Sequence, residues 1–273
     1  MSSSPQQSVS VIIPVYNGAD YIRGAMESVL RQTRPPEEII LVNDGSTDAS
    51  AGVLRELEEK NATVRVITQK NMGQAAASNA GAAQAHGTLL ALLDQDDRWL
   101  PEKLARQLPL FDQPNVILTY TDAHIVHEGQ GRTGRTAFGR VAPIRGRALP
   151  RLLFGSCITN ASVVVRADAY RAAGGLSTEP RHHRIQDYEL WLRLSRHGEF
   201  DFVPEPLVEH VRRRGSWSQA KVQLAWATLR LLASLSLDSA HGVTMWNKAH
   251  ALLRPMRDIL VASFRIDRLF GRV

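Results

Sequence analysis

A short apolar run that ends in acidic residues is the feature that most limits what this chain can fold into. Residues 89–93 are apolar at every position, and Asp94, Asp96 and Asp97 follow directly. Such a run is too short to span a membrane and is typical of a strand buried on both faces of a parallel sheet. Because ligands of open α/β sheets bind beyond the carboxyl ends of the strands, we expect a site where these acids stand.

The three carboxylates admit two interpretations. Neighbouring carboxylates repel one another, and a hard divalent cation with phosphate oxygens would relieve that repulsion. Alternatively, Asp96 and Asp97 cap a helix that begins around Pro101, which is a common role for Asp. This segment alone favours neither a metal site nor a helix cap.

The first hundred residues alternate between apolar runs and segments with helical spacing, which predicts a parallel, doubly wound sheet. The expected strands are 8–15, 38–42, 64–68 and 89–93, and the expected helices are 21–31, 48–60 and 74–85. We expect Pro14 to end the first strand. The loops after the first, second and fourth strands should bring a polar set to one edge of the sheet: Tyr16, Asn17, Asp44, Asp94 and Asp96.

The pattern is less regular after residue 100 and becomes all-helical after residue 214. The expected strands are 116–120, 159–165, 200–203 and 207–211, and the expected helices are 184–194, 218–237, 241–253 and 256–269. Residues 128–147 are rich in Gly and Arg without any period, which is typical of a surface loop. We therefore divide the chain into an α/β domain, residues 1–214, and a basic helical extension, residues 215–273.

Five segments follow one another in the chain: Val11-Ile-Ile-Pro-Val-Tyr-Asn17, Val42-Asn-Asp-Gly-Ser-Thr-Asp48, Asn71-Met-Gly-Gln74 with Asn79, Leu93-Asp-Gln-Asp-Asp97, and Gln186-Asp-Tyr-Glu-Leu-Trp-Leu192. In this order and spacing they resemble family 2 glycosyltransferases, over about residues 8–218. The resemblance implies a GT-A fold, which is Rossmann-like, with a mostly parallel central sheet flanked by helices. It also implies a nucleotide-sugar donor, a divalent cation and inversion at the anomeric carbon.

The resemblance places the donor nucleotide on the loops after the first two strands. Pro14, Tyr16 and Asn17 match the segment that lines the nucleoside, and Asp44 matches a carboxylate that accepts a hydrogen bond from the base. An ionised Asp only accepts hydrogen bonds, so it suits a base edge with an N–H, such as uracil N3. The alternative for Asp44 is a plain turn. The other residues that match donor-binding positions are Asn71, Gly73, Asn79, Asp94 and Gln95.

The acids after the fourth strand match the Asp-x-Asp motif of the family. By resemblance, Asp94 lies near the ribose and Asp96 ligates Mn²⁺ or Mg²⁺. Such a cation would neutralise charge that develops on the departing nucleoside diphosphate. We expect Asp97 to cap the following helix.

Asp187 matches the catalytic base of the family and lies in or just before the first turn of the expected helix 184–194. An inverting transfer is one in-line displacement, so a carboxylate must take the proton from the acceptor hydroxyl. A helix N-terminus favours the ionised form that a base needs, and the less favoured alternative is that Asp187 only stabilises its helix. The pattern departs from the family twice, because Gln186 replaces the usual Glu and Arg213 stands where His is usual. Together with Asn160, these two are the expected acceptor or diphosphate contacts.

The positive charge of the chain is concentrated in the extension. From residue 211 onward, eleven Lys or Arg stand against three Asp, a net charge of +8, whereas the first 210 residues carry −2. The overall charge is therefore no indication of nucleic-acid binding, and we expect none. Residues 256–270 have the spacing of a basic amphipathic helix. We favour a helix that packs on its own domain or forms a homodimer, and the alternative is peripheral contact with an anionic membrane.

The expected function is the transfer of one sugar from a nucleotide donor, a UDP-sugar, to a hydroxyl of a glycan or lipid-linked glycan, as in polysaccharide biosynthesis. The Gln-x-x-Arg-Trp signature of processive members is absent, which favours single-sugar transfer. A single cysteine, Cys157, and an amino terminus unlike a signal peptide predict a cytoplasmic protein, or one at the inner face of the membrane. The second hypothesis is a non-catalytic nucleotide-sugar-binding protein.

Overall fold

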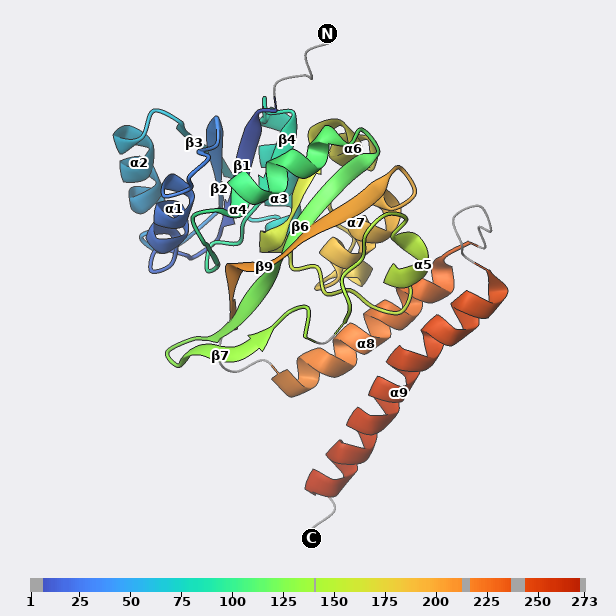
Figure 1. Cartoon of the computed structure of the whole chain (residues 1–273). Helices are drawn as coiled ribbons and strands as arrows, with labels where there is room; N and C mark the ends of the chain where they lie inside the picture. Colours follow the sequence, from blue (N-terminus) through green and yellow to red (C-terminus); the bar gives the residue numbers. More distant parts are fainter. Residues whose placement is uncertain (1–6, 140, 213–216, 237–243, 271–273) are drawn as a thin grey trace.

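The computed structural model describes residues 7–139, 141–212, 217–236 and 244–270. Nine strands among these residues form one sheet in the order β3-β2-β1-β4-β8-β6-β9-β5, with β7 paired to β6 (Figure 1). The strands are β1 (Val9–Val15), β2 (Glu38–Asp44), β3 (Val64–Gln69), β4 (Leu89–Leu92), β5 (Arg98–Trp99), β6 (Val116–His127), β7 (Gly131–Thr136), β8 (Val164–Arg166) and β9 (Glu199–Arg212). The α-helices are α1 (Ile22–Leu30), α2 (Ser50–Lys60), α3 (Gln74–Gln84), α4 (Lys103–Gln107), α5 (Leu149–Leu152), α6 (Ala167–Ala172), α7 (Gln186–Leu194), α8 (Trp217–Ser234) and α9 (Met245–Phe270). The 3-10 helices are η1 (Leu108–Asp112), η2 (Asn160–Ser162) and η3 (Pro180–His182).

The amino-terminal half of the sheet is parallel, as the alternation of strands and helices predicts. β1 pairs in parallel with β2 and β4, and β2 pairs in parallel with β3. Every residue of β1 is buried, because neighbouring side chains enter two different cores. Ile12 belongs to one apolar cluster, and Val11 and Ile13 belong to the other. Pro14 does not end this strand, since it lies inside β1 in register with Val42.

The other half of the sheet is mixed, so the sheet as a whole is less parallel than expected. β8 runs antiparallel to both β4 and β6, whereas β6 and β9 are parallel. β8 is a short strand that directly follows helix η2. Because β8 runs antiparallel to both of its neighbours, β4 and β6 point in the same direction. β4, β6 and β9 therefore have their carboxyl ends at the same edge of the sheet.

Three segments differ from the sequence-based expectation. Residues 128–147 contain β7, which pairs antiparallel with β6. β7 is exposed along most of its length and is held through backbone pairing, so it shows no apolar alternation. The expected strand 159–165 is η2 followed by β8. The two expected strands 200–203 and 207–211 are one strand, β9, because Pro204 and Pro206 interrupt the apolar pattern and shift the register with β6 without ending the pairing.

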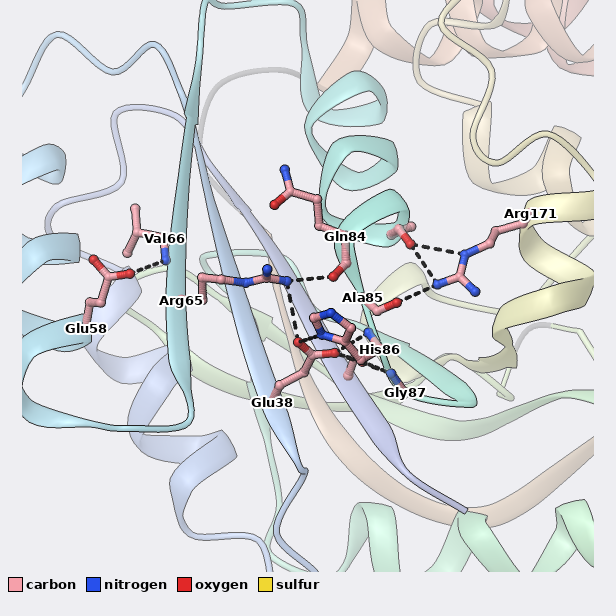
Figure 2. A network of polar contacts seen from close by, with 11 residues as sticks. Glu38, Glu58, Arg65, Val66, Gln84, Ala85, His86, Gly87 and Arg171 are labelled. Carbon is pink, nitrogen blue, oxygen red and sulfur yellow. Dashed lines mark hydrogen bonds and ion pairs between the residues drawn. The ribbon is translucent and has the colours of Figure 1, made fainter. Parts of the chain in front are cut away.

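A polar network at the amino ends of the parallel strands fixes helix α3 (Figure 2). The carboxylate of Glu38 accepts hydrogen bonds from the Ser10 hydroxyl and from the backbone N–H groups of His86 and Gly87. Burial opposes ionisation of Glu38, but these hydrogen bonds outweigh it and lower the pKa of the carboxyl. Arginines from β3 and α6 donate to the last carbonyls of α3, which have no partner inside the helix: Arg65 to Gln84, and Arg171 to Ala82 and Ala85. These contacts hold the carboxyl end of α3 in place, and the amino end of α3 points at the carboxyl edge of the sheet.

The helical extension consists of α8 and α9, which pack along each other (Figure 1). The two expected helices 241–253 and 256–269 form one helix, α9, with Pro255 inside it. Arg254 on α9 donates from Nη1 to the carbonyl oxygen of Phe154, just after α5, at 2.7 Å. In the part of the chain that the structure describes, no helix has both the length and the apolar character needed to span a membrane.

Candidate active site

The loops that follow β1 and β2 bind each other through side-chain hydrogen bonds. Asn17, with a left-handed backbone (φ 46°), accepts a hydrogen bond on Oδ1 from Thr47 N at 2.8 Å. The backbone N–H of Tyr16 donates to Gln95 Oε1 at 3.0 Å, and Gln95 Nε2 donates to Tyr16 O at 3.1 Å. Asn17 and Gln95 therefore hold the first loop in place, while the ring of Tyr16 is 44% exposed at the edge of the sheet.

Asp44, at the end of β2, anchors the loop that precedes α3. Its Oδ1 accepts hydrogen bonds from Gln69 Nε2 (2.7 Å) and Met72 N (2.9 Å), and its Oδ2 accepts one from Gly73 N (2.8 Å). The residue is only 2% exposed. The plain-turn interpretation is thus incomplete, because Asp44 determines where residues 71–73 lie. Each carboxylate oxygen has two acceptor positions, so Oδ2 keeps one for a donor from a ligand.

The neighbouring glycines have backbones that other residues rarely adopt. Gly45 has φ +69°, and a Cβ atom there would lie 2.7 Å from the backbone nitrogen of Asn71. Gly73 has φ +88° and immediately precedes α3, with its N–H also 3.2 Å from Asn71 Oδ1. The exposed loop around Asn71 is therefore packed closely against the end of β2.

Asn79 has a structural role that its match to a donor-binding position does not reveal. From α3, its Nδ2 donates to the Leu176 carbonyl, and its Oδ1 accepts hydrogen bonds from Leu176 N and the Tyr170 hydroxyl, all at 2.8 Å. These partners lie on and after α6. The amide of Asn79 thus joins α3 to this segment, and its assignment to the donor stays a prediction.

Asp94 lies at the centre of the carboxyl edge, where helix α3 and helix η2 meet the end of β4. Its Oδ1 accepts hydrogen bonds from Gln74 Nε2 at 2.6 Å and from Asn160 Nδ2 at 2.9 Å. Burial, followed by the charges of Asp97 and Asp96, raises the pKa of Asp94 to about 7. Asn160 thus contacts the acids directly, while its own Oδ1 is buried without a hydrogen-bond partner in the described structure.

Asp97 does not cap helix α4, contrary to expectation. Its carboxylate is 1% exposed and turns towards the end of β9, where Oδ1 accepts a hydrogen bond from Val211 N at 2.8 Å and Oδ2 lies 3.0 Å from His210 Nδ1. Burial would lower the pKa of His210, but the hydrogen bond and charge of Asp97, with the charge of Asp94, raise it overall. Sequence reasoning had singled out neither His210 nor its pairing with Asp97. The only signal was its position in the sequence, three residues before Arg213, which stands where the family usually has His.

Asp187 lies in the first turn of α7, where it was expected, directly after Gln186. Its Oδ1 accepts a hydrogen bond from Tyr188 N at 2.7 Å. Burial raises the pKa of Asp187, against the opposing effects of backbone hydrogen bonds and the charge of His210. The expected preference for the ionised form at a helix N-terminus is therefore outweighed by the loss of solvent around the carboxyl. Arg213 lies outside the described residues.

The model of glycosyl transferase family 2 matches residues 10–168, more than half of the chain. This chain belongs to that family. Among its relatives, the putative teichuronic acid biosynthesis glycosyltransferase TuaG of Bacillus subtilis is 31% identical over 191 residues, which are 70% of this chain and 73% of TuaG. An uncharacterized glycosyltransferase of Nostoc sp. is 46% identical over 110 residues, but this chain covers only 34% of that relative and 20% of another from Rickettsia felis.

Solved glycosyltransferases show the same fold. The mannosyltransferase PcManGT from Pyrobaculum calidifontis, in complex with GDP-Man and Mn²⁺, gives a TM-score of 0.73 at 15% identity and covers 99% of this chain and 77% of its own. Residues 1–349 of TarS from S. aureus give a TM-score of 0.66 at 17% identity, over 97% of this chain and 74% of that TarS fragment. TarS has also been solved with UDP and with UDP-GlcNAc. The mixed sheet of this glycosyltransferase is thus a GT-A fold, as the resemblance implied.

The acids of this glycosyltransferase fit a cation that substrate helps to bind. Among the residues that the structure describes, no three His, Cys, Asp or Glu side chains are grouped to hold a metal ion by themselves. Mg²⁺ and comparable hard cations are commonly held by one or two carboxylates together with substrate phosphates and water. Asp94 and Asp96 supply such a pair. Burial and then the neighbouring negative charges raise the pKa of Asp94, and a bound cation would favour its ionised form.

Proposed function

We propose that this glycosyltransferase moves a single sugar from a nucleotide-sugar donor, a UDP-sugar, to a hydroxyl of a glycan or lipid-linked glycan, with inversion and with a divalent cation. The observation that carries the proposal is the position of Asp187. Its carboxyl and that of Asp94 are both within electrostatic reach of His210, although they come from α7 and from the end of β4. We assign the pair Asp94 and Asp96 to the leaving group and the separate carboxyl of Asp187 to the acceptor.

The donor nucleotide is assigned to the loops after β1 and β2. The exposed ring of Tyr16 offers a face on which a base can stack, and the free acceptor position of Asp44 Oδ2 suits a base N–H. Pro14 lies in β1 just before this loop, and Asn17 and Gln95 hold the loop by hydrogen bonds. We assign the loop of Asn71 and Gly73, which is bound to Asp44, to the same nucleotide. TarS has been solved with UDP and PcManGT with GDP-Man, which supports a nucleotide at this edge. Because the two nucleotides differ, the nucleobase that this chain binds has to be tested.

The transfer reaction needs one carboxylate to accept a proton. Asp187 takes the proton of the acceptor hydroxyl. At the same time the hydroxyl oxygen forms a bond to the anomeric carbon, and the bond from that carbon to the diphosphate oxygen breaks. Asp96, with Asp94, would hold a divalent cation, which would supply positive charge beside the departing diphosphate. Asn160 and Gln186 lie beside these groups and are assigned to acceptor or diphosphate contacts, as is Arg213. Residues 1–214 form the catalytic part, in a cytoplasmic protein.

Replacement of the proposed catalytic base, Asp187, tests catalysis separately from donor binding. Asp187→Asn should lower kcat by about 10²- to 10⁴-fold, the usual contribution of general base catalysis, and leave donor affinity unchanged. Asp168→Asn is a matched control, because Asp168 also lies in the first turn of a helix and accepts a hydrogen bond from the next backbone N–H at 2.7 Å. A wild-type protein that binds donor but turns over no acceptor would favour the non-catalytic alternative.

A thermal-shift screen tests the donor and the cation together. UDP, GDP, dTDP and CMP are each added with and without Mn²⁺, because a ligand that binds only the folded protein raises Tm by mass action. We expect the largest shift with UDP and Mn²⁺, and its loss in Asp96→Asn. A shift with only one of the other nucleotides would mean that the donor carries a different nucleobase. A shift that is independent of Mn²⁺ would contradict metal-dependent binding of the donor.

A further inference from the structure

Helix α9 carries an apolar stripe on its solvent side. The stripe comprises Met245, Trp246, Leu253 and Met256, which are 74%, 72%, 59% and 48% exposed. At 3.6 residues per turn, these four positions fall within an arc of about 100°. Ala251 and Pro255, both buried, lie on the other side of the helix. The stripe therefore faces away from the packed side of α9, over the first three turns of the helix.

This stripe differs from the exposed apolar side chains of the main body, residues 7–212, which are scattered. There, the exposed large apolar side chains stand singly on different elements, as Leu30 does on α1 and Met72 does before α3. Contiguous exposed apolar side chains on one face mark a surface that binds something. Trp and Met at the head of the stripe are also suited to a boundary between water and an apolar phase, where a Trp ring keeps its N–H hydrated.

Charge decides between the two partners that an apolar helix face could take. The chain from residue 211 onward carries a net charge of +8, while the first 210 residues carry −2. A second copy that docked through the same face would bring two strongly positive extensions together. An anionic lipid surface would instead attract this positive charge. The apolar side chains of the stripe would also leave water by inserting at the depth of the lipid headgroups. Figure 1 shows α9 on the outer side of α8, pointing away from the main body, where a flat surface can reach it.

We propose that α9 binds the surface of an anionic membrane, with Met245, Trp246, Leu253 and Met256 inserted among the lipid headgroups. The helix lies in the plane of the surface, since no helix in the described part of the chain is suited to crossing the bilayer. The net positive charge of the extension attracts the lipid phosphates and carboxylates. The inference rests on the surface of α9 and holds whichever sugar or acceptor the active site uses.

Sedimentation with vesicles tests the proposal on the full-length protein. We expect binding to phosphatidylcholine vesicles that contain phosphatidylserine, weaker binding at high salt, and little binding to phosphatidylcholine alone. Trp246→Ser combined with Leu253→Ser should lower the partition coefficient about tenfold or more, because two large apolar side chains no longer leave water. Leu30→Ser is the matched control, since Leu30 is 45% exposed on α1 and its replacement should leave binding unchanged.

Two further measurements separate the outcomes. Brominated lipid should quench the tryptophan fluorescence of the wild type, and Trp246→Phe should bind vesicles as well as the wild type but lose most of that quenching. Light scattering after size exclusion gives the oligomeric state. A dimer that the double variant converts to monomer, without vesicle binding, would overturn the proposal in favour of a second copy. Vesicle binding that survives the double variant, or no binding by the wild type, would also overturn it.

Discussion

At the carboxyl edge of the sheet, Asp94, Asp97 and Asp187 differ in what surrounds their carboxyl groups. Burial and two other acids raise the pKa of Asp94, Asp97 binds His210, and burial raises the pKa of Asp187. The sequence predicted the chemical type and position of each residue. It could not predict the balance of solvation and charge around them, because that balance depends on groups from β9, α3 and η2.

The pH dependence of catalysis should reflect the raised pKa of Asp187. A base must be ionised, so kcat should fall as pH is lowered through a pKa above the ordinary Asp value of about 4. The measurement is log kcat against pH at saturating donor and Mn²⁺, where the bound cation keeps Asp94 ionised. Asp168→Asn should leave the profile unchanged. An acid limb at or below the ordinary value would contradict the effect of burial on Asp187.

Asp97 should act as a positioning residue for the end of β9. In Asp97→Asn, the amide can accept only one of the two hydrogen bonds that Val211 N and His210 Nδ1 now donate. Leaving one buried donor unpaired should cost about 1–3 kcal/mol of unfolding free energy. It should also lower kcat, with the pH profile displaced because the His210 pKa falls. Asp112→Asn, at an exposed side chain, is the control. A change in stability with an unaltered pH profile would reduce Asp97 to a purely structural residue.

At the level of elements, α3 connects the donor edge to the rest of the sheet. Its carboxyl end is held by the Glu38 network, its middle by Asn79, and its amino end follows the loop that Asp44 fixes. The helix was predicted from its Ala-rich pattern. The partners that hold it were not, because Leu176 is 97 positions from Asn79 in the chain, and no local pattern records that contact.

Asn79 and Asn71 should give opposite results when replaced by Ala. Asn79→Ala removes the partner of Leu176 N, Leu176 O and the Tyr170 hydroxyl, so it should lower the unfolding free energy by about 1–3 kcal/mol with little change in nucleotide Kd. Asn71→Ala, on the exposed loop, should weaken nucleotide binding with little change in stability. Urea denaturation and a nucleotide titration of both variants provide the comparison. Weakened nucleotide binding in a fully stable Asn79→Ala variant would instead support the donor assignment of Asn79.

Across the whole molecule, the parallel half of the sheet and the extension differ in how they are held. Every residue of β1 and β4 is buried between two apolar clusters. Helix α9 instead packs on α8 and is tied to α5 by the hydrogen bond from Arg254 to Phe154 O. We therefore expect the sheet and the extension to open with different free energies.

Native-state hydrogen exchange should resolve this difference. Amides of β1 should exchange only through global unfolding, and those of α9 through local opening. Arg254→Ala should speed exchange in α9 severalfold, consistent with the loss of about 1 kcal/mol from one hydrogen bond, and leave β1 unchanged. Arg230→Ala is the control, because the Arg230 guanidinium lies over Trp226 of its own helix, 6.0 Å from the ring centroid. Equal acceleration in β1 would mean that sheet and extension open together.

The sequence by itself determined the family, the parallel half of the sheet and the acids at its carboxyl edge. These features are local, since an apolar run, the helix after it and the polar residue at the turn lie within a few positions of one another. Only the tertiary structure decided the direction of β8, the pairing of Asp97 with His210 across 113 positions, and the raised pKa of Asp187. Those features depend on which strands become neighbours and on how much water their packing excludes, and neither quantity is written in any short stretch of the chain.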